Sequence, residues 1–83
     1  MTHRTTRAFW TLYRALPAEV QKLADEQYQL MRANPRHPSV RLKKVGPYWS
    51  ARVGIHYRAV ATQENGDLVW FWIGHHHEFD KIV

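Results

Sequence analysis

The apolar positions of the chain change their spacing near residue 39, from a helical period to a period of two. Before that point, apolar side chains recur every three or four residues along two segments, 6–16 and 17–33. Pro17 separates the segments and suits the first turn of a helix, whereas Pro35 and Pro38 end the second pattern. The first half of the chain therefore predicts a helical hairpin with one apolar side.

After residue 39, apolar and polar residues alternate along segments 40–45, 48–54 and 55–63, and segment 68–73 is apolar on both faces. Gly-Pro at 46–47 and Asn-Gly at 65–66 predict turns, and Gly54 falls in or beside a third. A simple alternation puts Trp70 and Trp72 on one face of the last strand and Val69, Phe71 and Ile73 on the other.

These elements predict one α+β domain over residues 1–83. The N-terminal helical hairpin would pack on one face of an antiparallel sheet of about four strands, and the other face would be left for function.

Composition narrows the classes of partner. The 83 residues include no cysteine, which excludes disulfides and thiolate zinc sites and fits a cytoplasmic protein. No apolar run approaches the ~20 residues of a membrane span, so no membrane partner is expected. The formal net charge of +5 favours nucleic acid or an acidic protein as the partner. The alternative is a basic surface that only keeps the protein soluble.

Three histidines, His75 to His77, follow the last apolar run. If the strand continued, His75 and His77 would lie on one side and His76 with Glu78 and Asp80 on the other. Adjacent histidines rarely converge on a metal without ligands from elsewhere, and no HExxH motif is present, so neither a metal nor a cofactor is expected. Proton transfer suits an imidazole at the mouth of a cleft. The alternative is a polar strand end without chemistry.

Two arginines, Arg52 and Arg58, fall on adjacent strands of a predicted hairpin, with His56 between them. Guanidinium groups could stabilise charge on a phosphodiester, and an imidazole could move the proton. The alternative is that the arginine stems only cover an apolar sheet face. The alternation puts Arg41 and Lys43 on one face and Lys44 on the other, as a stripe that tracks phosphates or as a solvated surface.

The segment "RVGIHYRAV", followed about a dozen residues later by "WFWIGHH", resembles a pattern of the RelE/ParE family of bacterial type II toxins. The resemblance covers nearly the whole chain. Its Gly-His-His ending, with an acid-aromatic-acid run after it, is similar to the cytotoxic translational repressors. The resemblance implies a small basic toxin neutralised by an acidic, amphipathic antitoxin. RelE-like members cleave mRNA in the ribosomal A site, where the ribose 2′-OH attacks its neighbouring phosphate without a metal.

Carried over residue by residue, the resemblance places Arg58 at the arginine that acts on the phosphate and Arg52 at the basic position before it. His75 and His76 stand where these nucleases place a basic or imidazole group, and His77 is a third candidate acid or base. Phe79 stands near the late aromatic position; it can stack on a base, but it has no hydroxyl to transfer a proton. The residues expected to contact RNA are Arg41, Lys43, Lys44, Trp49, His56 and Phe79.

One departure bears on the chemistry. RelE has a lysine pair in the second strand, and the corresponding "YWSAR" has none, so histidine would have to act as the base. The ParE branch shares the fold but inhibits DNA gyrase and cleaves no RNA. A gyrase inhibitor, or an inactive homologue that acts only in complex formation, is therefore the alternative to a ribosome-dependent endoribonuclease.

Overall fold

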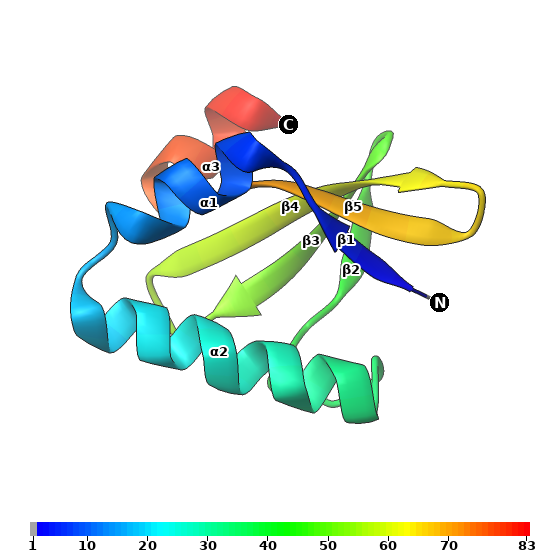
Figure 1. Ribbon diagram of the computed structural model, residues 1–83. Coiled ribbons are helices and arrows are strands. Elements are labelled where there is room, and N and C mark those ends of the chain that lie inside the picture. Colours follow the sequence, from blue (N-terminus) through cyan, green and yellow to red (C-terminus); the bar gives the residue numbers. More distant parts are fainter. Residues whose placement is uncertain (1) are drawn as a thin grey trace.

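The computed structural model describes residues 2–83, which form three helices and one mixed sheet of five strands (Figure 1). In chain order, the elements are β1 (His3–Thr5), α1 (Arg7–Arg14), α2 (Ala18–Ala33), β2 (Lys43–Val45), β3 (Tyr48–Val53), β4 (Tyr57–Glu64), β5 (Asp67–His75) and α3 (His76–Ile82). The strand order is β1-β5-β4-β3-β2, with β1 parallel to β5 and the other pairs antiparallel. The predicted α+β class is confirmed, with five strands instead of four.

The helical hairpin forms as its sequence predicts. The Thr6 side chain caps α1 by accepting the Phe9 N–H at 3.2 Å. At the other end of α1, the Gln21 side chain donates to the carbonyls of Tyr13 and Leu16 at 3.2 and 3.1 Å. These contacts satisfy carbonyls that a helix end leaves without partners, and they tie the start of α2 to the end of α1.

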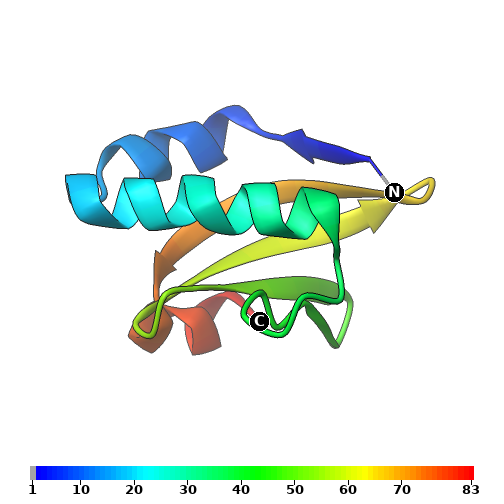
Figure 2. The same cartoon turned by 90° about the horizontal axis from the view of Figure 1, so that it is seen from below.

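The core lies between the hairpin and one face of the sheet. α1 and α2 lie on that side, whereas α3 lies on the other side, below the sheet in Figure 2. Small residues of the central strands leave room for the larger side chains of α2 and β5. The buried core cluster comprises Val20, Met31, Val40, Ala51, Val53, Ala59, Ala61, Leu68, Trp70 and Ile73.

Strand β1 has no counterpart in the alternation pattern. It has three polar residues and is held by its register with β5, in which His3 pairs with Leu68. The Trp70 indole N–H donates to His3 Nδ1 at 3.1 Å, and the two rings stack with centroids 6.1 Å apart. Pairing with β5 makes this segment a strand, because the residues of β1 themselves have no apolar period.

A β-bulge corrects the faces expected for β5. Ala61 pairs with Trp70 and Val60 with Trp72, so Phe71 is an extra residue on β5. Trp70 and Ile73 consequently both enter the core, at 4% and 2% exposure. Trp72 turns to the opposite face. The expectation that Trp70 and Trp72 share a face was wrong, because a bulge breaks the period of two.

The first predicted strand, 40–45, is shorter in the structure. Val40 is buried, but β2 begins only at Lys43. Between them, Arg41 has a φ of 49°, which is outside the extended region. The alternation expected from the sequence, with Arg41 and Lys43 on one face of a continuous strand, therefore does not hold.

The chain does not stay extended for long after residue 74. The faces assigned to residues 75–80 on the assumption of a continuing strand therefore do not apply. The His76 N–H donates to the His56 carbonyl at 2.7 Å, and α3 begins at the same residue. His75 caps this helix, because its Nδ1 accepts the His77 N–H at 3.2 Å. Glu78 in the first turn and Lys81 in the last, joined by an ion pair of 3.3 Å, are the sequence signal that indicates a helix here. Across residues 2–83, no helix has the length and apolar character needed to span a membrane.

Candidate functional site

Two arginines occupy directly opposed positions on β3 and β4. Arg52 pairs with Arg58 in the ladder, so both side chains rise from the same face of the sheet, the face that carries α3. Among residues 2–83, no carboxylate lies within 4.0 Å of either guanidinium. Like charges opposite each other weaken a sheet. An anion bound between them would relieve that repulsion, so the pair is a candidate phosphate site.

Each guanidinium is held by a different contact. The Arg52 Nε donates to the Gly54 carbonyl at 2.9 Å, within the turn between β3 and β4. The Arg58 guanidinium carbon lies 5.5 Å from the centre of the Phe79 ring, which is a cation–π contact from α3. Helix α3 therefore positions Arg58. The structure brings Phe79 to Arg58 through a helix that the sequence pattern did not indicate.

Gly74 lies opposite Arg58 in the β4–β5 ladder. A Cβ added at Gly74 would stand 2.7 Å from the Trp72 ring, which is closer than carbon atoms approach one another. The glycine therefore leaves room for the Trp72 indole beside Arg58.

Aromatic side chains accompany the arginines on this face. Tyr48 shares the side of β3 with Arg52, and its ring lies 5.6 Å from that of Phe71. Trp72 completes this set. Trp49, the residue expected to stack on RNA, lies on the opposite face, where it pairs with Ala61 and donates to Gln63 at 3.2 Å. Alternation along β3 separates Trp49 from the arginines, and the bulge in β5 supplies Trp72 in its place.

The basic residues before β3 do not all lie on the same face of the sheet. Lys43 pairs with Ser50 and so lies on the arginine face, whereas Lys44 pairs with Trp49 on the other face. Arg41 precedes β2, and together with Arg52 it lines a shallow depression beside Gly54. The structure therefore places Lys43 on the side of the arginine pair and Lys44 on the other face, and Arg41 shares only the depression with Arg52.

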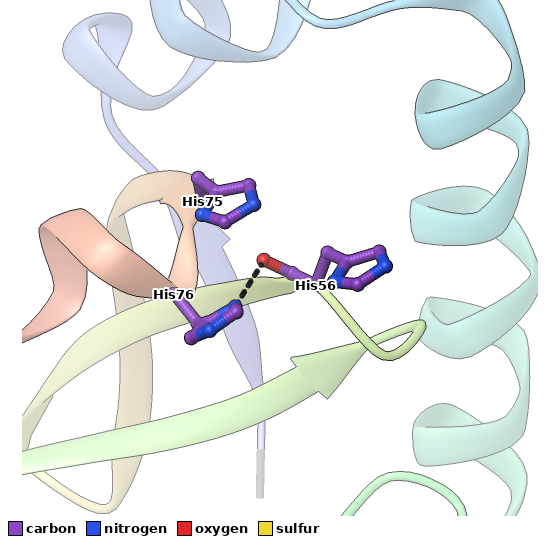
Figure 3. A group of neighbouring side chains, drawn as sticks. All are labelled: His56, His75 and His76. Carbon is purple, nitrogen blue, oxygen red and sulfur yellow. Dashed lines mark hydrogen bonds between the residues drawn. The ribbon is translucent and has the colours of Figure 1, made fainter.

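The histidines gather at the end of the sheet, where the β3–β4 turn meets the end of β5. His56 comes from the turn, and His75 and His76 from the β5–α3 junction (Figure 3). The centroid of the His56 ring lies 5.9 Å from that of His75 and 6.1 Å from that of His76. The His76 Nδ1 lies 3.0 Å from the His56 carbonyl oxygen, to which it donates.

The three adjacent histidines face different surroundings. His76 and Phe79 are three residues apart in α3, so both lie on the side of this helix that faces the sheet and Arg58. His75 pairs with Tyr57 and belongs to the face that carries α1 and α2, whereas His77 is exposed. Of the three, His76 is therefore the imidazole that the fold turns toward the arginine side.

The electrostatics of this cluster favour the neutral form of His75. The pKa of His75 lies below its ordinary value, first because desolvation disfavours the charged form, and then because the neighbouring imidazoles repel a further positive charge. A neutral imidazole can accept a proton near neutral pH. The cluster can therefore supply a base.

Comparison with known proteins rests on the fold. No protein-family model matches the chain, and no curated protein matches it significantly. Solved structures do match. A chain of the RelB–RelE antitoxin–toxin complex from Methanococcus jannaschii aligns with a TM-score of 0.69 and 15% identity, over 95% of this chain and 96% of that chain. The chain has the RelE/ParE toxin fold.

Two further structures of this fold agree. The toxin–antitoxin complex RelBE2 from Mycobacterium tuberculosis aligns with a TM-score of 0.66 and 19% identity, over 89% of this chain and 95% of that chain. A copper-bound mutant toxin from Helicobacter pylori aligns with a TM-score of 0.63 and 14% identity, over 94% and 97%. At such identities the likeness establishes the RelE/ParE fold, and function has to be argued from the site.

Proposed function

We propose that this chain is the toxin of a type II toxin–antitoxin system and acts as a ribosome-dependent mRNA endonuclease in the cytoplasm. The observation that carries the proposal is the cross-strand pair Arg52 and Arg58, which no carboxylate neutralises among residues 2–83, beside aromatic rings and imidazoles. Forked guanidinium groups match the geometry of a phosphate. The RelE/ParE fold agrees with this function.

In the proposed reaction, the scissile phosphate binds between the two guanidiniums. His76 takes the proton of the ribose 2′-OH, whose oxygen attacks the adjacent phosphorus, and a second imidazole of the cluster gives a proton to the departing 5′-oxygen. Arg58 and Arg52 stabilise the negative charge that grows on the phosphorus oxygens. Histidine therefore takes the role of the lysine pair that the "YWSAR" segment lacks.

The RNA strand would be held by the aromatic face. Bases of single-stranded RNA stack on aromatic rings, and basic side chains bind its phosphates. Tyr48, Phe71 and Trp72 supply rings on the side of the arginines, and Lys43 and Arg41 supply charges. In this proposal Trp72 takes the place of Trp49 as the stacking residue.

An acidic antitoxin would cover the same face. Two of the solved structures with this fold are complexes of a toxin with its antitoxin. The formal charge of +5 would favour an acidic partner, and the rings beside the arginines would favour an amphipathic one.

The test is to induce the protein in growing cells and to map new 5′ ends on translated mRNA within minutes. Wild type should produce codon-linked cuts. Arg58→Ala should lower the cleavage rate by about 10²–10³, the scale for removing one charge-stabilising group. Arg36→Ala is the matched control, because Arg36 is exposed in the loop after α2, and it should cleave like wild type.

Two results would contradict the proposal. Intact transcripts accompanied by gyrase-linked DNA breaks would assign the ParE-like activity. Intact transcripts without growth arrest would indicate a homologue that acts only in complex formation.

A further inference from the structure

Histidines from two separate segments meet at one end of the sheet. The side chains of His56, His75 and His76 each offer a ring nitrogen, and these three nitrogens all lie within 4.8 Å of one another. Figure 3 shows the rings grouped at the point where the β3–β4 turn passes the start of α3. His56 is the ligand from elsewhere that a run of adjacent histidines would need in order to enclose an ion.

We propose that His56, His75 and His76 bind one divalent transition-metal ion of the zinc, copper or nickel class. Imidazole suits these ions, whereas magnesium and calcium prefer oxygen ligands. Three imidazoles with a fourth, open position are an established coordination set for zinc. The open position would face solvent, because His56 is exposed.

Coordination requires only a small rearrangement. Bonds of about 2.0–2.1 Å in a tetrahedral site bring ligand nitrogens to about 3.4 Å from one another. The nitrogens now all lie within 4.8 Å of one another, so an approach of at most about 1.4 Å would close the site. Rotation of exposed or half-buried imidazole rings can supply this approach without a movement of the backbone. One hydrogen bond changes, because coordination through the His75 Nδ1 would replace the bond of 3.2 Å that this atom accepts from the His77 N–H.

The surroundings of His76 already favour a ligand role. Its Nδ1 lies 3.0 Å from the His56 carbonyl oxygen, which can only accept, so Nδ1 carries the proton and Nε2 keeps a free lone pair. A carbonyl that fixes the tautomer in this way is the usual outer partner of a metal-binding histidine. The backbone bond of 2.7 Å from the His76 N–H to the same carbonyl holds the two segments together. The site is thus partly organised before an ion arrives.

The test uses the untagged full chain, treated with a chelator and then titrated with Zn²⁺ by calorimetry. Titration with Co²⁺ in parallel reports four-coordinate geometry through its visible absorption. Wild type should bind one ion. His56→Gln and His76→Gln should each weaken binding at least about 10-fold, the scale on which even outer partners of a ligand act. His77→Gln is the matched control, because His77 is exposed and lies outside the trio, and its affinity should equal that of wild type.

An equal affinity of wild type and His56→Gln would overturn the proposal, because it would show that the adjacent histidines bind metal as a flexible tag does. A wild-type chain that shows no saturable binding of the ion would overturn the proposal as well. So would a loss of affinity in His77→Gln that is as large as the loss in His56→Gln. Imidazole ¹⁵N shifts of the unmodified chain give an independent readout: Zn²⁺ should move the resonances of His56, His75 and His76 and leave those of His37 in place. None of these measurements depends on RNA cleavage.

Discussion

The contact between Gly74 and Trp72 allows a quantitative test of how the arginine face is built. In Gly74→Ala, the new Cβ would stand 2.7, 3.1 and 3.3 Å from three atoms of the Trp72 ring, where carbon atoms prefer about 3.5–4.0 Å. Overpacking of this kind costs about 1–3 kcal/mol. The backbone adds no strain, because Gly74 is not among the glycines with positive φ. Alanine also lowers the entropy of the unfolded chain, which stabilises by about 0.4–1 kcal/mol. The net loss should be about 1–2 kcal/mol.

The assay is urea unfolding of four proteins: wild type, Gly74→Ala, Trp72→Leu and the double variant. In the Trp72→Leu background the ring is gone, so Gly74→Ala should become neutral or stabilise by about 0.4–1 kcal/mol. The coupling free energy between the two positions should therefore be about 1–3 kcal/mol. Gly66→Ala is the control, because Gly66 has open space around it but a φ of 85°, so its loss should not depend on Trp72.

Additive free energies of unfolding would refute this reasoning. If Gly74→Ala and Trp72→Leu combine within about 0.3–0.5 kcal/mol, the two positions do not interact. The indole would then not lie over Gly74, and Trp72 would lose its assigned place beside Arg58.

The remaining predictions concern the contacts that hold the helices in place. Phe79→Leu removes the ring beneath Arg58 and should lower the free energy of unfolding by about 0.5–1 kcal/mol. This loss should vanish in an Arg58→Met background. An equal loss in both backgrounds would argue against the cation–π contact. Tyr13→Phe removes the hydrogen bond of 2.8 Å to Asp25 and should cost about 0.5–1.5 kcal/mol by urea unfolding at neutral pH, so an unchanged midpoint would contradict it. The pKa of Tyr13 is raised, first by desolvation and then by the Asp25 carboxylate, so its contribution to stability is complete below the unfolded pKa of about 10 and is lost as the pH rises above it. The difference in midpoint between wild type and Tyr13→Phe should therefore shrink as the pH rises above about 10, and a difference that grows would contradict the assigned sign.

Local patterns of the sequence were sufficient for much of the fold. The helical hairpin follows from a period of about 3.6 residues and from prolines at its ends, and both are properties of neighbouring residues. The opposition of Arg52 and Arg58 follows from alternation on two strands joined by a short turn. The sequence alone thus predicted the hairpin, the central strands and the arginine pair.

The elements that the sequence missed depend on distant partners. Strand β1 has no apolar period and forms because β5 offers an edge to it. The bulge at Phe71 appears only in the register between β4 and β5, and it decides that Trp72, not Trp49, accompanies the arginines. Helix α3 carried weak local signals in Glu78 and Lys81, which the three preceding histidines masked.

The histidines show the same division. The sequence determined that three imidazoles follow the last strand, and from adjacent ligands alone no metal site was expected. Only the tertiary structure decided that His56, from the turn before β4, meets His75 and His76. The physical reason is that the β4–β5 pairing brings the start of one strand to the end of the other, and a period along the chain contains no information about such a meeting.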